Sequence, residues 1–325
     1  MRALARAAGV FGAGAQLWSR VLGRVLGYPV SVGGCCVAAP GSLNVLITGA
    51  SSGLGEELAY AYARQGHAVA LLARRKQRLE AAAERCRALG ARDVIILPFD
   101  TTLRDNIDAA VAILDARWKQ IDRVYLNAGG SGDRFKRKRE EHYMECCTGD
   151  DLTAASFSAD SAEWVMRLNY LAIVYWLEPL LARMRRQGHG TIAITGSVAA
   201  DGNLPRSGPY TASKLSLRAL LEGLRYDARK LGVRLCLIEC GYFVSELTDP
   251  KSGALFLLQT ADAASRAMKG VEAGKGVIRF PWQMSLLSRV CALGPRWIRD
   301  RFWDRKLSPL RAADANPQAS KQVSP

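Results

Sequence analysis

The sequence predicts an α/β protein with a parallel sheet covered by helices on both faces, and three observations support this. Short apolar, often β-branched runs typical of buried parallel strands occur at residues 43–48, 68–73, 93–98, 122–127, 190–195 and 233–239. Segments of helical pattern separate them. The 325 residues are 49% hydrophobic, which is enough for one large core. This alternation predicts a doubly wound sheet whose ligand crevice lies beyond the carboxyl ends of the strands.

The first strand leads directly into a glycine-rich turn. Gly49 lets the chain turn sharply, Gly53 lets the backbone approach a pyrophosphate, and Gly55 lets a helix pack closely on the strand. The helix expected at residues 54–65 would direct its free N–H groups and positive dipole end at the phosphates, and two serines are placed to cap it. A ligand-free corner is the alternative for an isolated motif. The residues expected to contact the phosphates are Gly49, Ser51, Ser52, Gly53, Leu54 and Gly55.

The second strand ends at Arg74 and Arg75. A domain of this type that prefers NAD usually carries an acidic residue here for the ribose 2′-hydroxyl. A guanidinium instead makes paired hydrogen bonds to a 2′-phosphate, so we expect NADP(H) to be preferred over NAD(H). The alternative is that both arginines form a solvated helix start. Residues 81–89 and 105–118 suit the first two crossover helices.

Tyr210 and Lys214 lie one helical turn apart and can share one helix face. A phenol has an ordinary pKa of about 10 and is a poor base near neutral pH. A protonated lysine one turn away favours the phenolate, and the positive nicotinamide of an oxidised cofactor would add to this effect. Tyr210 can then exchange a proton with a carbonyl or alcohol oxygen while a hydride moves at carbon. Such spacing is common on helices, so the alternative for this pair taken alone is that Tyr210 is an ordinary half-buried aromatic residue and Lys214 a solvated charge.

The chain resembles the short-chain dehydrogenase/reductase family over residues 43–275. Beyond the glycine turn, the resemblance rests on ordered motifs at Asp100, at Asn127, Ala128 and Gly129, and at Asn169, Ser197, Tyr210 and Lys214. Any one of these occurs by chance, but their joint order after suitable strands is specific. The resemblance implies a Rossmann-type fold, an adenine-side contact from Asp100, and a water held by Asn169 in a proton relay. It also implies that Lys214 holds the nicotinamide ribose.

Ser197 alone would be routine turn chemistry after a strand. Within the constellation, its hydroxyl can donate to the substrate oxygen as negative charge develops. The sequence departs from the family after the last predicted strand, where Cys240 and Gly241 replace Pro-Gly. Gly241 keeps the close approach to the nicotinamide side, but the loop loses the rigidity of proline. Cys240 is either a redox-sensitive thiol or a small buried apolar residue, and we favour packing.

A long segment separates Gly129 from Asn169 and contains a basic run at residues 134–141. Residues 133–145 hold five basic and four acidic residues, so a solvated flap fits better than an anion, membrane or nucleic-acid site. An apolar segment at residues 254–258 is either a cover for a hydrophobic substrate or a core helix. No histidine or cysteine cluster has metal-ligand spacing, so we expect no metal.

The formal net charge of +15 is concentrated at the two ends of the chain. Residues 1–40 carry four arginines and no acid on a helical apolar pattern, which suits a mitochondrial transit peptide or an interfacial helix. Residues 279–325 carry nine basic and three acidic residues among many aromatics. This arm either packs over the substrate cleft or a subunit partner, or rests on a membrane. We divide the chain into 1–41, 42–278 for the nucleotide-binding domain, 279–311 for the arm, and 312–325 as a disordered tail.

The function expected from the sequence is an NADP(H)-dependent oxidoreductase that interconverts a lipophilic carbonyl and a secondary alcohol. A catalytically weak nucleotide-binding scaffold or redox sensor with the same fold is the alternative. We expect a homo-oligomer, no nucleic-acid partner and peripheral membrane contact. The expected location is mitochondrial in a eukaryote, and otherwise cytoplasmic or peripheral to a membrane.

Overall fold

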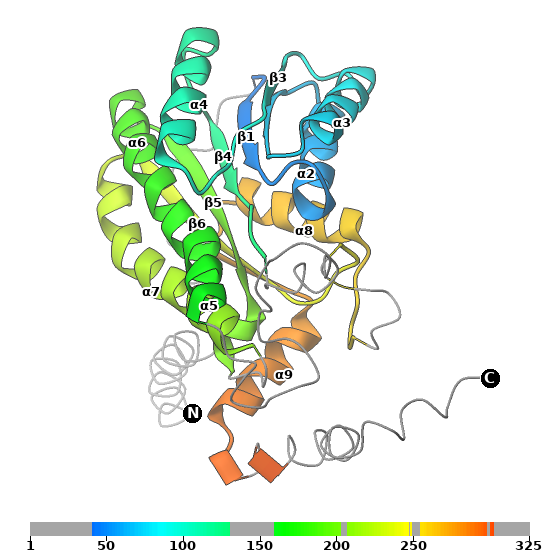
Figure 1. Ribbon diagram of the computed structural model, residues 1–325, viewed down its shortest axis with the longest axis vertical. Helices are drawn as coiled ribbons and strands as arrows, with labels where there is room; N and C mark the ends of the chain where they lie inside the picture. Colours follow the sequence, from blue (N-terminus) through cyan, green and yellow to red (C-terminus); the bar gives the residue numbers. More distant parts are fainter. Residues whose placement is uncertain are drawn as a thin grey trace, which may run out of the picture.

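A computed structural model of the chain describes residues 41–130, 159–202, 207–246, 248, 254–297 and 300–301. One sheet of seven parallel strands, in the order β3-β2-β1-β4-β5-β6-β7, forms the centre (Figure 1). The strands are β1 Asn44–Thr48, β2 Ala68–Leu72, β3 Val94–Leu97, β4 Arg123–Leu126, β5 Gly190–Ser197, β6 Val233–Cys240 and β7 Val277–Phe280. The doubly wound α/β fold predicted from the sequence is thereby confirmed.

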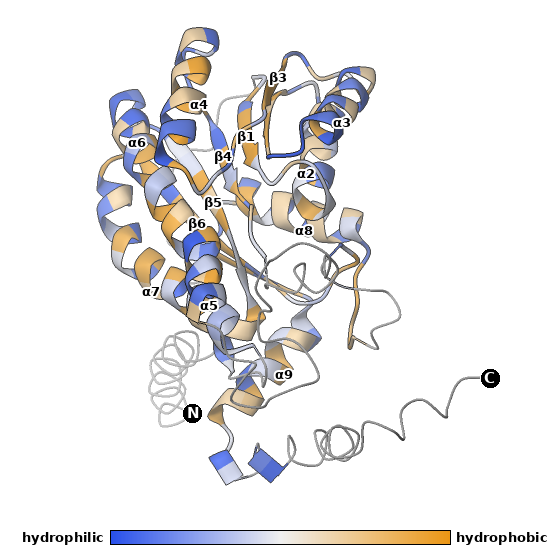
Figure 2. Cartoon of the chain, viewed as in Figure 1, coloured by the Kyte–Doolittle hydropathy of each residue, from blue (hydrophilic) through white to orange (hydrophobic). Residues whose placement is uncertain are grey.

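Helices form a layer on each face of the sheet. They are α2 Gly53–Ala63, α3 Lys76–Ala88, α4 Arg104–Arg117, α5 Ala159–Met166, the π-helix η2 Arg167–Leu171, α6 Ala172–Gln187, the 3₁₀-helix η3 Val198–Asp201, α7 Gly208–Lys230, α8 Thr260–Glu272 and α9 Trp282–Leu293. The apolar sides of α2, α3 and α8 pack on one face, and those of α4, α6 and α7 pack on the other. Both faces are therefore buried, which explains why the strands are almost continuously apolar (Figure 2).

The direction of winding reverses between β1 and β4. The chain moves outward from β1 to β3 and then returns to place β4 on the other side of β1. The Thr48 hydroxyl fixes this junction, because it accepts hydrogen bonds from the backbone N–H of Asn127 at 3.0 Å and of Ala128 at 3.1 Å. A crevice at the carboxyl ends of β1 and β4 is where ligands bind in sheets of this kind.

The strands match the predicted ranges to within two residues, except that an additional strand is present. β7 pairs in parallel with β6, with Ile238 beside Ile278. The expected boundary after residue 278 therefore falls inside a strand. The short run at 277–280 has a charged residue, Arg279, at its third position, so local hydrophobicity does not reveal it.

Several predictions concern residues outside the described part of the chain. These are the transit-like or interfacial segment of residues 1–40, the basic run at 134–141, and the polar tail from residue 312. Within the described residues, no helix is both long enough and apolar enough to cross a membrane.

Candidate functional site

The glycine turn adopts the conformation that the sequence predicts. Gly49 and Gly53 have φ angles of 70° and 60°, in the left-handed region that favours glycine. A Cβ on Gly55 would lie 2.4 Å from the Gly49 carbonyl oxygen, so only glycine allows α2 to pack this closely on β1. Around Gly53 the nearest atom to an added Cβ would be 3.8 Å away, in Ser245. The backbone at Gly53 therefore has room for a close-approaching ligand.

The expected capping by the two serines of the turn is not present. Ser52 occupies the N-cap position of α2, but its side chain makes no capping hydrogen bond. The hydroxyls of Ser51 and Ser52 instead accept from Arg75, at 2.9 Å and 2.8 Å. Because neither hydroxyl satisfies the first N–H groups of α2, these groups and the positive end of the helix dipole remain available to an anion.

The arginines at the end of β2 have different partners. Arg74 is exposed and lies 3.7 Å from the carboxylate of Asp100. Asp100 also accepts from the Thr102 backbone N–H at 2.9 Å and from the Thr102 hydroxyl at 2.7 Å. Arg75 turns toward the glycine turn and contacts Glu246, which lies in the segment after β6. Arg75 is therefore held at the glycine turn and is not a solvated helix start, whereas Arg74 is exposed to solvent.

Three residues from two elements meet at the carboxyl end of β5. Tyr210 and Lys214 lie on α7, and the Lys214 ammonium is 5.7 Å from the centre of the Tyr210 ring. Lys214 donates to the Thr195 carbonyl oxygen at 2.9 Å. Ser197, the last residue of β5, hydrogen-bonds the Tyr210 side chain and accepts from the Ala199 N–H at 3.1 Å. The structure thus brings together the serine, tyrosine and lysine named from the sequence.

The ionisation of this group differs from the sequence expectation. Burial raises the pKa of Tyr210 above its ordinary value, and Ser197 only partly offsets this effect. Burial lowers the pKa of Lys214 to about 8. The Lys214 ammonium donates to the Thr195 carbonyl oxygen and lies 5.7 Å from the centre of the phenol ring, so it acts on the phenol from a distance. A further positive charge beside the phenol would also favour the phenolate.

Asn169 is fully buried in the π-helix η2. Its side-chain oxygen accepts from the Gly130 N–H at 2.9 Å, and its amide donates to the Gly130 carbonyl at 2.9 Å and to the Ser213 hydroxyl at 3.0 Å. A Cβ on Gly129 would lie 3.0 Å from the Asn169 oxygen and 3.4 Å from the Lys214 nitrogen. Asn169 therefore fixes the loop after β4 against α7, and Gly129 makes this close approach sterically feasible.

The departures after β6 have structural explanations. Gly241 donates to the Phe280 carbonyl at 2.7 Å, and a Cβ there would lie 3.0 Å from Pro281. The thiol of Cys240 is buried and donates to the Gly196 carbonyl at 3.5 Å, while burial raises its pKa to about 11. A protonated, enclosed thiol supports the packing role over redox sensitivity. In the segment at 254–258, Leu255 and Phe256 are exposed rather than part of a core helix.

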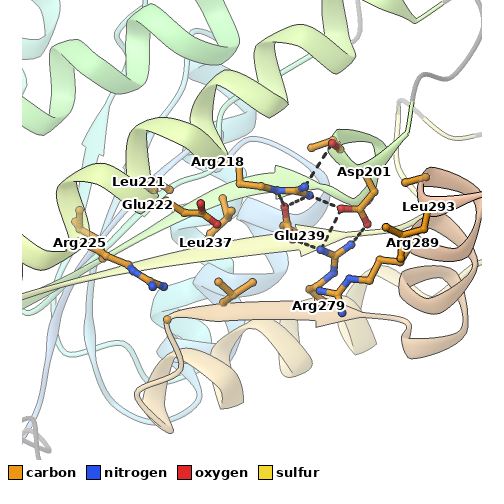
Figure 3. Close-up of a pocket in the computed structure, with 15 residues that line it drawn as sticks. Asp201, Arg218, Leu221, Glu222, Arg225, Leu237, Glu239, Arg279, Arg289 and Leu293 are labelled. Atoms are coloured by element: carbon orange, nitrogen blue, oxygen red, sulfur yellow. Dashed lines mark hydrogen bonds and ion pairs between the residues drawn. The ribbon is translucent and has the colours of Figure 1, made fainter. Parts of the chain in front are cut away.

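A buried cluster of side-chain ion pairs lies beside α7 and was not predicted from the sequence. Arg218, one turn beyond Lys214, lies 2.6 Å from Glu239 and 2.8 Å from Asp201, and Arg279 contacts the same two carboxylates (Figure 3). Burial raises the pKa of Glu239. Burial also opposes ionisation of Asp201, but hydrogen bonds from Arg279 and Ser288 outweigh it and lower the pKa. A cavity of about 330 Å³ lies beside the cluster.

The fold and these side chains define a class of protein, namely nucleotide-binding oxidoreductases of the doubly wound type. The family model for short chain dehydrogenases matches residues 43–254. The chain is 30% identical over 258 residues to an uncharacterised oxidoreductase of Myxococcus xanthus, covering 79% of this chain and 94% of that protein. It is 31% identical over 287 residues to an 11-beta-hydroxysteroid dehydrogenase-like protein of Arabidopsis thaliana, covering 83% and 84%. The chain belongs to the short-chain dehydrogenase/reductase family and is an oxidoreductase acting on CH–OH groups.

Solved structures agree with the fold. A short-chain dehydrogenase from Sphingobium yanoikuyae in complex with NADPH has a TM-score of 0.62 at 24% identity, covering 87% of this chain and 98% of that one. A family member from Burkholderia phymatum in complex with NAD has a TM-score of 0.64 at 21% identity, covering 82% and 95%. Both nicotinamide cofactors thus occur among proteins of this fold.

The ion cluster predicts a pH-dependent loss of stability in Asp201→Asn. Removing the charge leaves two guanidinium groups partly uncompensated, so unfolding in urea at pH 7 should become easier by about 3 kcal/mol. Because the pKa of Asp201 is lowered, its stabilisation is present above an unfolded pKa of about 3.9 and is lost as the pH falls below it. The difference between the proteins should therefore shrink in acid.

The control for this experiment is Asp227→Asn, since that carboxylate is exposed and pairs with Lys230 on the same helix. It should change stability by less than about 0.5 kcal/mol at any pH. Equal stability of Asp201→Asn and the unaltered chain at pH 7 would contradict the role assigned to the cluster.

Proposed function

We propose that the protein is an NADP(H)-dependent oxidoreductase that interconverts a carbonyl and a secondary alcohol. The observation that carries the proposal is the meeting of Ser197, Tyr210 and Lys214 at the crevice that also holds the glycine turn. The turn fits a dinucleotide, because Gly53 leaves open space and the N-terminus of α2 is uncapped by side chains. Gly49, Gly53 and Gly55 would hold its pyrophosphate, and Arg75 its 2′-phosphate. A bound nicotinamide would supply or accept the hydride.

The chain's own residues handle the proton. Tyr210 donates its phenolic proton to the carbonyl oxygen during reduction, or removes it from the alcohol during oxidation. Ser197 donates a hydrogen bond to the same oxygen while negative charge develops. Lys214 holds the nicotinamide ribose and adds positive charge beside the phenolate. Because burial lowers its pKa to about 8, the ammonium carries its charge below that pH and loses it as the pH rises above it. Asn169 accepts a hydrogen bond from the Gly130 N–H and thereby holds the loop after β4 in place beside these side chains.

A catalytically weak scaffold or redox sensor has less support than an enzyme. All three side chains needed for proton transfer are present and mutually close. The neighbouring thiol of Cys240 is buried with a raised pKa, which disfavours oxidation. A lipophilic substrate is supported by the exposed Leu255 and Phe256 after the cofactor-side strand and by the hydroxysteroid dehydrogenase-like names of relatives such as the Arabidopsis protein.

Replacing Tyr210 with phenylalanine tests the acid–base role. The variant should reduce carbonyl substrates about 10²–10⁴-fold more slowly, because it lacks the proton donor. Its affinity for NADPH, measured by fluorescence titration, should remain close to that of the unaltered chain. Tyr226→Phe is the matched control, as Tyr226 is exposed on the same helix. A Tyr210→Phe protein that turns over at the parent rate would refute the assignment.

The cofactor preference is tested with Arg75→Ala. Binding of 2′,5′-ADP should weaken by about tenfold or more because a charge-assisted pair of hydrogen bonds is lost, while 5′-AMP binding should change little. Calorimetric titration measures both ligands. Arg87→Ala, in the last turn of α3, removes the same charge away from the crevice. If the unaltered chain binds 5′-AMP as tightly as 2′,5′-ADP and Arg75→Ala alters neither, the NADP(H) preference is wrong.

We also propose peripheral contact with an anionic membrane through α9. Trp282, Leu286, Val290 and Leu293 recur every three or four residues, and Trp297 continues the series. Their exposed fractions lie between 51% and 69%, so the described residues of this chain do not cover them. Arg296 is exposed beside the series. An apolar, Trp-bearing helix side with an exposed arginine beside it suits the headgroup boundary of an anionic bilayer.

The membrane proposal predicts co-sedimentation of the full chain with phosphatidylserine-containing vesicles and weaker co-sedimentation with phosphatidylcholine alone. Leu286→Ser/Val290→Ser should reduce binding by about tenfold or more, because each side chain loses more than about 1 kcal/mol of apolar burial. Leu103→Ser/Ile113→Ser alters two exposed apolar residues of the α4 region instead and should have no effect. If vesicles are not bound and the α9 variant changes a dimer to a monomer, the series is a subunit contact.

A further inference from the structure

Glu246 reaches the cofactor crevice from a part of the chain distant in sequence. It lies in the segment after β6, where Phe243 bridges to Leu258 and Ser245 forms a short turn with Thr248. The preceding residue, Ser245, lies over the glycine turn, 3.8 Å from where a Cβ on Gly53 would be. The Glu246 carboxylate therefore lies beside Arg75 and close to the glycine turn, the residues that the proposed function assigns to the dinucleotide.

The Glu246 carboxylate holds Arg75 with both oxygens. Nη1 of Arg75 donates to them at 3.0 Å and 3.1 Å. The other donors of the same guanidinium point to the serines of the turn: Nε reaches the Ser51 hydroxyl at 3.2 Å, and Nη2 reaches the Ser51 and Ser52 hydroxyls. Arg78 pairs with Glu246 as well. Every guanidinium nitrogen of Arg75 is thus engaged, two by serine oxygens of the turn and one by a carboxylate.

A ribose 2′-phosphate and a ribose 2′-hydroxyl would meet this arrangement differently. A phosphate needs the same donors that Glu246 occupies, and the two anions repel each other at contact distance. A hydroxyl can donate a hydrogen bond to the carboxylate, which is the role of the acidic residue in NAD-preferring domains. The sequence lacks an acidic residue at the end of β2. Glu246, in the segment after β6, places a carboxylate against Arg75 instead.

We propose that Glu246 is a specificity-determining residue that opposes the 2′-phosphate at Arg75 and thereby limits the discrimination between NADP(H) and NAD(H). The proposal rests on the cofactor role of Arg75 in the proposed function. Glu246 acts as a competing anion: when it is ion-paired, Arg75 and Arg78 are partly neutralised, and a 2′-phosphate must displace it. A 2′-hydroxyl leaves the ion pair in place.

The test is calorimetric titration of the full chain with 2′,5′-ADP and 5′-AMP, comparing the unaltered protein with Glu246→Gln. This substitution keeps the shape and removes the charge. We expect 2′,5′-ADP to bind about tenfold more tightly, the scale expected for one like charge removed at a partly exposed site. Binding of 5′-AMP should stay the same or weaken. Glu80→Gln is the matched control, because Glu80 is an exposed carboxylate on α3 that pairs with Lys76.

Tighter 2′,5′-ADP binding in Glu246→Gln, with no change in Glu80→Gln, supports the proposal. An unchanged or weakened affinity for 2′,5′-ADP in Glu246→Gln overturns it, since the carboxylate would then either lie apart from the phosphate or hold Arg75 in its binding position. Failure of the proposed cofactor preference is a separate result. It appears as equal binding of the two ligands by the unaltered chain together with a silent Arg75→Ala, whereas failure of the present proposal appears as an unchanged or weakened 2′,5′-ADP affinity in Glu246→Gln.

Discussion

The parallel direction of all the described strands is the constraint on which the rest of this structure depends. Parallel neighbours need a long crossover between them, so helices must cover both faces and the strands must be apolar throughout. The same constraint gathers every strand's carboxyl end at one edge. Thr48, Ser197 and Cys240 each end a strand there, which is why residues from distant parts of the sequence meet in one crevice. The chemistry then depends on the few side chains that this edge presents.

Much of the fold and the core of the site could be predicted from the sequence because the signals are local. The apolar runs give six strands, the glycine spacing gives the turn, and Tyr210 and Lys214 share one helix. Roles that depend on a bound cofactor, such as that of Asp100, remain predictions. The serines of the turn were predicted as helix caps, because N-cap preference is local, but Arg75 takes their hydroxyls instead.

What the sequence did not reveal is long-range pairing between charged groups. Arg75 and Glu246 are separated by 171 positions, and Arg279 and Asp201 by 78. No spacing rule connects such residues, and the local sequence around each of them is typical of an ordinary surface charge. β7 was missed for a related reason: it is four residues long and carries Arg279, whose guanidinium is satisfied by carboxylates of η3 and β6 and by the Ser285 hydroxyl of α9. The effect of burial on the Tyr210 pKa likewise required the three-dimensional arrangement.

The place of Arg279 decides how the C-terminal arm can be studied. Arg279 begins the segment that the sequence suggests is an appendage, yet its guanidinium lies in the interior beside Asp201 and Glu239. A chain shortened after residue 278 would leave two enclosed carboxylates facing Arg218 alone and would interrupt the sheet's edge strand. Impaired folding of such a chain would report on the interior of the domain and not on what the arm binds. Point changes on the outer side of α9 avoid this confusion, because they leave the anchoring ion pairs intact.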